Sequence, residues 1–152
     1  MNFISIFIAR YLYIFSIAAA VVFFVAKTRE IKKRLAVCFV AIASLSYIIS
    51  RIASRFYYDP RPFVAGHFTP LIAHAPDNGF PSDHVLLAGA VAMAVYFYNK
   101  KLGAALWAIA AVIGIARIYA GIHHFADVFG GAAIVVLSAA IYYYVVHKFK
   151  FL

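Results

Sequence analysis

The chain has 152 residues, of which 66% are hydrophobic and 12% charged, and its mean hydropathy is +0.92. Soluble domains average about 45–50% apolar and about 25% charged residues, so this composition excludes a disordered chain, a collagen-like fibre and an ordinary soluble globule. The net charge of +9 does not indicate a nucleic-acid partner, because the basic residues are scattered between apolar runs. We therefore expect an integral membrane protein with one domain over residues 1–152.

Five apolar segments predict about five transmembrane helices, since a spanning helix needs about 20 mostly apolar residues. They cover residues 3–26, 35–57, 84–98, 102–119 and 127–146. The first segment has no basic stretch before it and is too long for the core of a signal peptide, so we expect it to span the membrane. The third segment is short, and we expect its N-terminal end to lie slightly inside the hydrocarbon boundary.

The lysines predict the orientation in the membrane. All seven follow the first, third or fifth segment, and they are Lys27, Lys32, Lys33, Lys100, Lys101, Lys148 and Lys150. Basic residues are concentrated in cytoplasmic loops, so this side is predicted to be cytoplasmic. The N-terminus and the long connection over residues 58–83 are then expected on the outer face.

The outer face carries a different set of ionisable residues. Four of the five acids and five of the six histidines fall there, together with four arginines near helix ends, which are Arg51, Arg55, Arg61 and Arg117. Ionisable residues at membrane helices are functional candidates, because burying them is costly. Arg10 is the exception, and we expect its side chain to extend to the interface. All five prolines lie in the connection over 58–83, which predicts turns and one short helix there.

Three polar clusters converge on this face. They are residues 55–62 at the end of the second segment, 81–84 at the start of the third, and 117–127 between the fourth and fifth. Arginine is the preferred partner of phosphate, because its planar guanidinium donates several hydrogen bonds in a fixed fork. The second cluster opens a helix, where free N–H groups and the helix dipole also favour an anion. The clusters together predict a phosphate site.

Two histidines suggest the chemistry at this site. His123 and Asp127 are four residues apart, so on one helical turn they can form a hydrogen bond. A carboxylate on one imidazole nitrogen fixes the tautomer and leaves the other nitrogen free to attack phosphorus. His84, from another segment, can protonate the leaving oxygen. This combination predicts phosphoryl transfer through a phosphohistidine.

The clusters resemble the signature motifs of the type 2 phosphatidic acid phosphatase (PAP2) family, membrane lipid phosphatases related to vanadium haloperoxidases. The usual motifs are a Lys followed by Arg-Pro, then Pro-Ser-Gly-His, then Ser-Arg-x5-His-x3-Asp. The third motif matches from Arg117 to Asp127, with Ala116 in place of its Ser. The second matches at residues 81–84, with Asp83 in place of Gly.

The first motif matches only in part. Arg61 and the proline after it fit, but Ser54 stands where the family has its Lys, and Arg55 is the expected substitute. The resemblance covers about residues 50–130 and implies an all-helical core shared with the haloperoxidases. That core usually has six membrane helices, of which this chain is expected to lack the first.

The resemblance also implies a role for each residue. His123 would be the nucleophile, Asp127 its orienting carboxylate and His84 the general acid. The residues expected to hold the substrate phosphate are Arg55, Arg61, Arg117, Ser82 and Asp83. No metal ion or other cofactor is implied. His124 lies off the family spacing and is not the expected nucleophile.

The sequence leaves the partner of Arg51 open. It lies one turn before Arg55, and like charges at this spacing destabilise a helix unless an anion or a carboxylate lies between them. A second substrate phosphate would supply that negative charge, and so would an ion pair with Asp59 or Asp77.

The Pro-Ser-Asp-His form resembles the branch of bacterial undecaprenyl-diphosphate phosphatases, which act on the outer face of the plasma membrane. The implied reaction converts undecaprenyl diphosphate to undecaprenyl phosphate. Phosphatidylglycerophosphate and phosphatidic acid remain alternative substrates. A small anion transporter is the alternative of another class, although transporters tend to have paired halves with broken helices near the midplane. The oligomeric state is left open.

Overall fold

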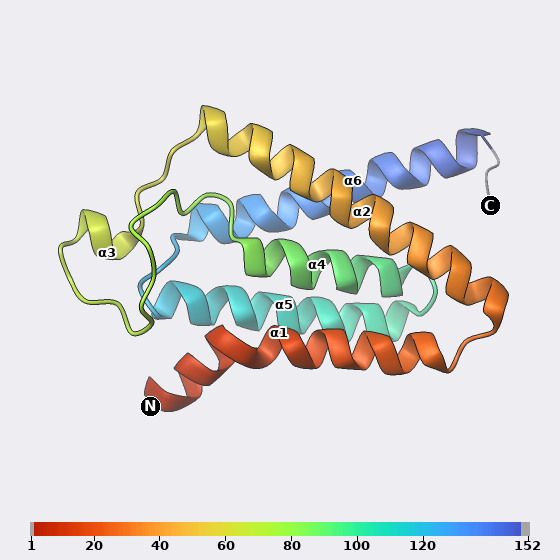
Figure 1. Ribbon diagram of the computed structural model, residues 1–152, viewed down its shortest axis with the longest axis horizontal. Coiled ribbons are helices and arrows are strands. Elements are labelled where there is room, and N and C mark those ends of the chain that lie inside the picture. The colour runs from red at the N-terminus through yellow and green to blue at the C-terminus, as the bar shows by residue number, and fades with distance from the viewer. Residues whose placement is uncertain (1, 150–152) are drawn as a thin grey trace.

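The computed structural model describes residues 2–149, and every regular element in that range is a helix. Five long helices alternate in direction along the chain (Figure 1). They are α1 (Asn2–Val25), α2 (Arg29–Phe56), α4 (Asp83–Tyr96), α5 (Lys100–Tyr119) and α6 (Phe125–Phe149). A single helical turn, α3 (Pro62–Ala65), lies in the connection between α2 and α4. The predicted all-helical fold is confirmed.

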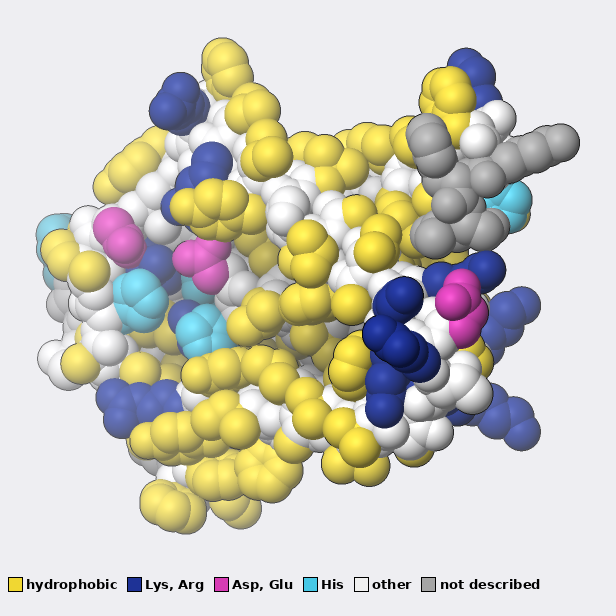
Figure 2. Space-filling model, turned by 45° about the vertical axis from the view of Figure 1, so that its right-hand side comes forward, with side chains coloured by type: hydrophobic (Ala, Val, Ile, Leu, Met, Phe, Trp, Pro, Cys, Tyr) yellow, Lys and Arg dark blue, Asp and Glu magenta, His cyan; other side chains and the backbone are white. Residues whose placement is uncertain are grey.

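Four of these helices, α1, α2, α5 and α6, are long and apolar enough to cross a membrane. The remaining long element, α4, has 14 residues and is about 21 Å long. It is an apolar helix shorter than a full span, as the short third segment of the sequence predicted. Apolar side chains cover the flank of the bundle, and charged side chains gather towards its two ends (Figure 2).

The short helix α4 forms the centre of the bundle and packs against α1, α2, α5 and α6. Nine of its residues are buried, and all nine are glycine, alanine, valine or leucine. A helix that is apolar on all sides is typical of such a central position. Close packing against α5 depends on Gly103, because a Cβ there would collide with the backbone of Tyr96.

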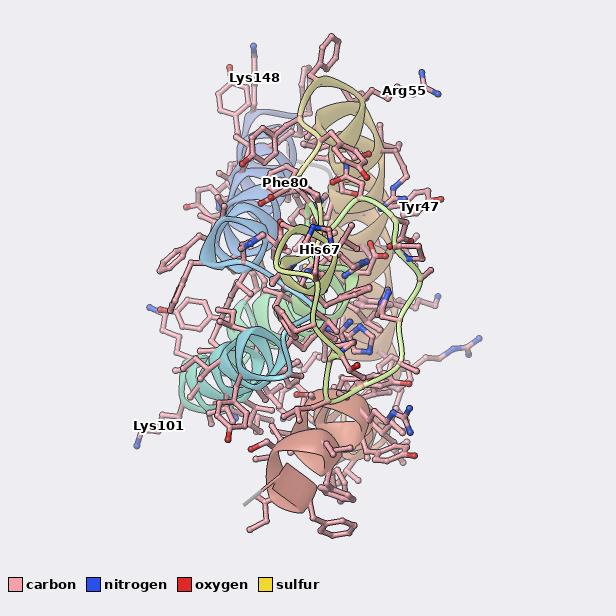
Figure 3. All side chains as sticks on the ribbon, turned by 90° about the vertical axis from the view of Figure 1, so that its left-hand side faces the viewer. Tyr47, Arg55, His67, Phe80, Lys101 and Lys148 are labelled. Atoms are coloured by element: carbon pink, nitrogen blue, oxygen red, sulfur yellow. The ribbon has the colours of Figure 1, made fainter. Side chains whose placement is uncertain are left out.

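The alternating directions separate two kinds of residue. The ends of α2 and α5 and the starts of α4 and α6 lie towards the end of the bundle that carries α3, and this end holds the three polar clusters (Figure 1). The lysines lie towards the opposite end, and Lys150 lies outside the described residues. The side chains of Lys101 and Lys148 project outwards from the bundle (Figure 3). The fold therefore joins the clusters into one site and keeps the lysines away from it.

Candidate active site

A polar cavity of about 420 Å³ opens at the end of the bundle that carries α3. Histidine, acidic and basic side chains gather there on the surface (Figure 2). The residues of this cavity that matter below are Arg51, Arg61, Asp83, His84, Arg117 and His123. They come from α2, the connection after it, α4, α5 and the junction between α5 and α6. The cavity therefore brings together residues from all three sequence clusters.

The centre of the site is the buried pair of His123 and Asp127. Nδ1 of His123 lies 3.1 Å from Oδ2 of Asp127, and the two side chains are 2% and 0% exposed. His123 lies two residues before α6 and Asp127 lies in the first turn of this helix, so the spacing of four residues brings them together. The same oxygen, Oδ2, accepts a hydrogen bond of 2.8 Å from the backbone N–H of His124. The carboxylate is thus oriented towards Nδ1 and favours the tautomer with a free Nε2.

The other ring nitrogen of His123 faces a guanidinium. Nη1 of Arg61 lies 3.4 Å from Nε2 of His123 and donates a hydrogen bond of 2.8 Å to the carbonyl of Ile122. Nε of Arg61 donates to Oδ1 of Asp77 at 2.7 Å, which holds the pKa of that carboxyl below its usual value although burial alone would raise it. Arg61 is 5% exposed, so these bonds fix its position.

The electrostatics of the site lower the pKa of His123 and so favour its neutral form. Burial lowers the pKa of its imidazole, and the hydrogen bond with Asp127 opposes this effect. The positive charges of Arg117 and Arg61 lower the pKa further. A neutral imidazole with Nδ1 bonded to a carboxylate has its lone pair on Nε2, which is the form required of a nucleophile.

Two buried donors near the cavity have unused bonding capacity. Arg117, in the last turn of α5, is 4% exposed and donates from Nη1 to the carbonyl of Ala9 at 3.2 Å. Its Nε has no hydrogen-bond partner among the described residues, and neither does the hydroxyl of Ser82 at the N-cap of α4. Buried donors without acceptors are costly, so an anion that accepts from them is stabilised.

His84 lies on the same cavity as His123, at the start of α4. Its ring packs edge-on against that of Tyr13 with the centroids 5.1 Å apart, so α1 helps to orient it. A general acid must face the reacting group, and the shared cavity meets this requirement.

Arg55 is not brought to the cavity. Its side chain is exposed and points away from the bundle (Figure 3). The C-terminal end of α2 diverges from the other helices (Figure 1), so the last turn lies too far out, and Arg51, one turn earlier, lines the cavity instead. The structure therefore does not place Arg55 where the sequence predicted.

Asp83 forms an ion pair with an arginine, whereas the sequence predicted that it binds the substrate phosphate. Its Oδ1 lies 3.1 Å from Nη2 of Arg51, and the two side chains are 72% and 46% exposed. The pairing of Arg51 with Asp59 or Asp77, which the sequence left open, is not formed. An ionised carboxylate accepts hydrogen bonds and repels an anion, so direct phosphate binding by Asp83 disagrees with this arrangement.

Asn78 organises the connection and was not identified from the sequence. Its Oδ1 accepts from the backbone N–H groups of Asp59 and Phe80, at 2.9 and 3.0 Å. Its Nδ2 donates to the carbonyls of Ser54 and Tyr57, at 3.2 and 3.0 Å. These bonds fasten the connection to the end of α2. The only signal in the sequence was an asparagine followed by glycine in a proline-rich segment.

A second polar group adjoins Asp127 and was also missed. Asp59, His124 and Asp127 each offer one ligand atom, and these atoms lie within 4.8 Å of one another. Such a set of oxygen and nitrogen donors can hold a divalent cation. Nδ1 of His124 is 3.2 Å from Oδ1 of Asp59. Gly79 closes one side of the group, because a Cβ there would lie 2.8 Å from Oδ2 of Asp127.

The sequence has recognisable relatives. It is 32% identical over 154 residues to the bacitracin transport permease protein BcrC of Bacillus licheniformis, an alignment that covers 100% of this chain and 75% of the relative. It is 35% identical over 96 residues to the undecaprenyl-diphosphatase BcrC of Bacillus subtilis, covering 63% of this chain and 50% of that protein. A putative undecaprenyl-diphosphatase of Escherichia coli, YbjG, is 33% identical over 94 residues, which are 48% of its length.

The fold has a solved counterpart. The crystal structure of Aquifex aeolicus LpxE matches with a TM-score of 0.72 and 25% sequence identity, over 93% of this chain and 86% of LpxE. The family model of the PAP2 superfamily matches residues 35–151, which include every element from most of α2 onwards and the whole cavity. The chain therefore belongs to the PAP2 superfamily and is a membrane lipid phosphatase.

Proposed function

We propose that the protein hydrolyses undecaprenyl diphosphate to undecaprenyl phosphate at the outer face of the plasma membrane. The observation that carries this proposal is the buried pair of His123 and Asp127, beside Arg61 at a cavity that Arg117 also lines. The relatives named as undecaprenyl-diphosphatases support the choice of lipid.

The reaction has two steps. Nε2 of His123 attacks the terminal phosphorus, the bond to the bridging oxygen breaks, and His84 donates a proton to the departing lipid phosphate. Water then attacks the phosphohistidine, His84 accepts the proton of this water, and inorganic phosphate leaves. Asp127 keeps Nδ1 protonated throughout and stabilises the imidazole as positive charge develops on it. No step requires a metal ion.

The charge on the transferred group is stabilised by fixed donors. In the transition state the phosphoryl group carries its negative charge on three equatorial oxygens. Preorganised donors aimed at these oxygens supply most of the catalysis in such reactions. Arg61 comes from the connection after α2 and Arg117 from α5, so they approach from different elements. The hydroxyl of Ser82 and the N-terminus of α4 add neutral donors.

The second phosphate of the substrate is assigned to Arg51. Arg51 and Asp83 line both the polar cavity and a neighbouring, mainly apolar cavity of about 430 Å³ between α2 and α4. With the terminal phosphate at His123, the lipid-linked phosphate lies beside Arg51. It then replaces Asp83 as the ion-pair partner of the Arg51 guanidinium. The hydrocarbon chain then continues past Leu86 and Leu87.

The outer location rests on the distribution of lysines. The six described lysines lie towards the end of the bundle opposite the cavity, and basic residues of membrane proteins are concentrated on the cytoplasmic side. With this orientation the cavity opens outside the cytoplasm, and the phosphate is released there.

Phosphate release by the purified protein tests the proposal. Undecaprenyl diphosphate, undecaprenyl phosphate, phosphatidylglycerophosphate and phosphatidic acid are compared, each with and without EDTA. We expect the diphosphate to have the highest kcat/KM and EDTA to have no effect. Faster turnover of a phospholipid would reassign the substrate, and loss of activity in EDTA with recovery on adding a divalent metal would overturn the metal-free mechanism.

A transporter is the second candidate, because one relative is named a transport permease. A transporter moves an anion or a lipid across the bilayer without cleaving it. The same assay separates the two functions, since a transporter releases no phosphate from any of the four lipids.

A further inference from the structure

One oxygen of the orienting carboxylate is left without a donor by the site described so far. Oδ2 of Asp127 accepts hydrogen bonds both from Nδ1–H of His123 and from the backbone N–H of His124. Oδ1 is completely buried and has no hydrogen-bond partner among the described residues. A buried carboxylate oxygen without a donor costs free energy. The site therefore requires a further hydrogen on this side of Asp127.

The ionisable groups that adjoin Asp127, besides His123, are Asp59 and His124. Asp59 follows α2 in the connection, its side chain is 14% exposed, and its Oδ1 lies 3.2 Å from Nδ1 of His124. One oxygen of its carboxyl lies within 4.8 Å of one oxygen of Asp127. Two carboxylates this close in a buried site cannot both be ionised at low cost, because like charges there repel strongly.

We infer that Asp59 is a positioning residue, which carries one proton and donates it to Oδ1 of Asp127. Nδ1 of His124 lies 3.2 Å from Oδ1 of Asp59 and adjoins this carboxyl on its other side. The two carboxyl groups then share one negative charge, and this charge is directed at Nδ1–H of His123. A hydrogen-bonded chain from Asp59 through Asp127 to His123 thus fixes the direction of the nucleophilic Nε2.

The electrostatics of Asp59 agree with this assignment. Burial raises the pKa of the Asp59 carboxyl, and the negative charge of Asp127 raises it further, while His124 opposes both. The backbone of Asp59 is anchored separately, since its N–H donates to Asn78 and its carbonyl accepts from Gly79 at 2.8 Å. A change of the Asp59 side chain therefore leaves these backbone bonds in place.

A bound divalent cation would satisfy the same oxygen. A cation requires a carboxylate at residue 59, whereas the shared proton requires only a hydrogen-bond donor there. This difference provides the test. An asparagine amide can donate to Oδ1 of Asp127 and accept from His124, so it replaces a protonated carboxyl. An amide is a much weaker ligand for a divalent cation than a carboxylate, so Asp59→Asn would not support a metal site.

The experiment compares Asp59→Ala and Asp59→Asn with wild type in the full-length protein. Glu30→Ala is the matched control, because it removes an exposed carboxylate at the opposite end of the bundle. We expect Asp59→Ala to lower kcat about tenfold or more with KM within about twofold, because Asp59 acts through Asp127 and not on the substrate. Asp59→Asn should recover most of kcat, and all variants should melt within a few degrees of wild type.

Two results would overturn the inference. One is a kcat for Asp59→Ala equal to that of wild type. The other is an Asp59→Asn protein that melts like wild type but is as inactive as Asp59→Ala, which would mean that the carboxylate itself is needed.

The inference rests on the proposed function for its readout, so a substrate-independent measurement accompanies it. Vanadate bonds to a histidine in the geometry of the transition state, and its affinity reports the orientation of His123. We expect Asp59→Ala to weaken vanadate binding and Asp59→Asn to restore it. If wild type cleaves none of the lipids, the proposed function fails, and equal vanadate affinities for wild type and Asp59→Ala would overturn the positioning role separately.

Discussion

Nη1 of Arg61 lies 3.4 Å from Nε2 of His123, although 62 residues separate them in the chain. The guanidinium is therefore placed beside the atom proposed to attack phosphorus. Nη1 also donates to the carbonyl of Ile122, while Nε donates to Asp77 and Nη2 to the carbonyl of Asn78. Such a donor needs no rearrangement when negative charge develops on the transferred oxygens. The site is preorganised for phosphoryl transfer before substrate enters.

The nucleophile is tested by replacing the two adjacent histidines separately. His123→Ala should reduce kcat below about a thousandth of wild type, because His123 is the one described histidine of the cavity that is paired with a buried carboxylate. His124→Ala should keep a tenth or more of the activity, since its backbone N–H still bonds Asp127. His67→Ala, at an exposed position in the connection, is the matched control and should match wild type.

The intermediate itself should be trapped from wild type by rapid quenching with labelled substrate. A phosphohistidine is labile in acid and stable in alkali, whereas a phosphoserine shows the reverse. Substantial turnover by His123→Ala, or an acid-stable phosphoenzyme, would contradict the assignment.

Arg117→Lys tests the geometry of the anion pocket. Lysine keeps the positive charge but loses the planar fork, and its single ammonium cannot replace both the bond to the carbonyl of Ala9 and the free Nε. We expect kcat to fall by about 100-fold or more while the melting temperature changes little. Vanadate should inhibit wild type competitively and bind the variant more weakly. An Arg117→Lys enzyme with near wild-type kcat would show that charge alone suffices.

Two arginines one turn apart on α2 offer a matched pair. Arg51 lines the cavity and Arg55 points away from it (Figure 3), so only Arg51→Gln should affect catalysis. We expect Arg51→Gln to lower kcat/KM about tenfold or more for the diphosphate and much less for the monophosphate, because only the diphosphate places a group at Arg51. Arg55→Gln should match wild type for both. Equal losses for both substrates would remove Arg51 from the second-phosphate site.

The dependence of kcat/KM on pH follows from His123. Its pKa lies below the ordinary value of 6.5, so the neutral nucleophile persists as the pH falls through 6.5 and is lost only at lower pH. Arg61→Gln removes one of the charges that lower this pKa, so the acid limb of its profile should move to higher pH. A profile measured for both proteins checks this, and a limb that moves to lower pH would contradict it.

Membrane orientation is tested by labelling single cysteines in intact cells. The native Cys38 is buried and is replaced by alanine to remove background. Ala75→Cys, exposed in the connection, should react with an impermeant thiol reagent, and Lys101→Cys should react only after the cells are opened. The reverse pattern would place the cavity in the cytoplasm and exclude a substrate in the outer leaflet.

Several features could be predicted from the sequence because they depend on neighbours in the chain. Runs of apolar residues define membrane helices locally, so the helices, including the short α4, are recognisable by composition. His123 and Asp127 are four residues apart, and any helical turn at this position brings their side chains together. Lys27 and Lys100 follow apolar segments that run in the same direction, and this alone places them at one end of the bundle.

Other features were decided only by the tertiary structure. Whether Arg51 or Arg55 reaches the cavity depends on where α2 diverges from the bundle, and both residues satisfy the same local pattern. The contacts of Asp59 with His124, of Arg61 with His123 and of Asp83 with Arg51 join residues far apart in the chain. The first two form because the connection between α2 and α4 folds back over the junction of α5 and α6, and Asn78 holds it in that path. The third forms because α2 packs against α4. Long-range contacts of this kind leave no periodic trace in a sequence, because they require the packed bundle to bring the partners together.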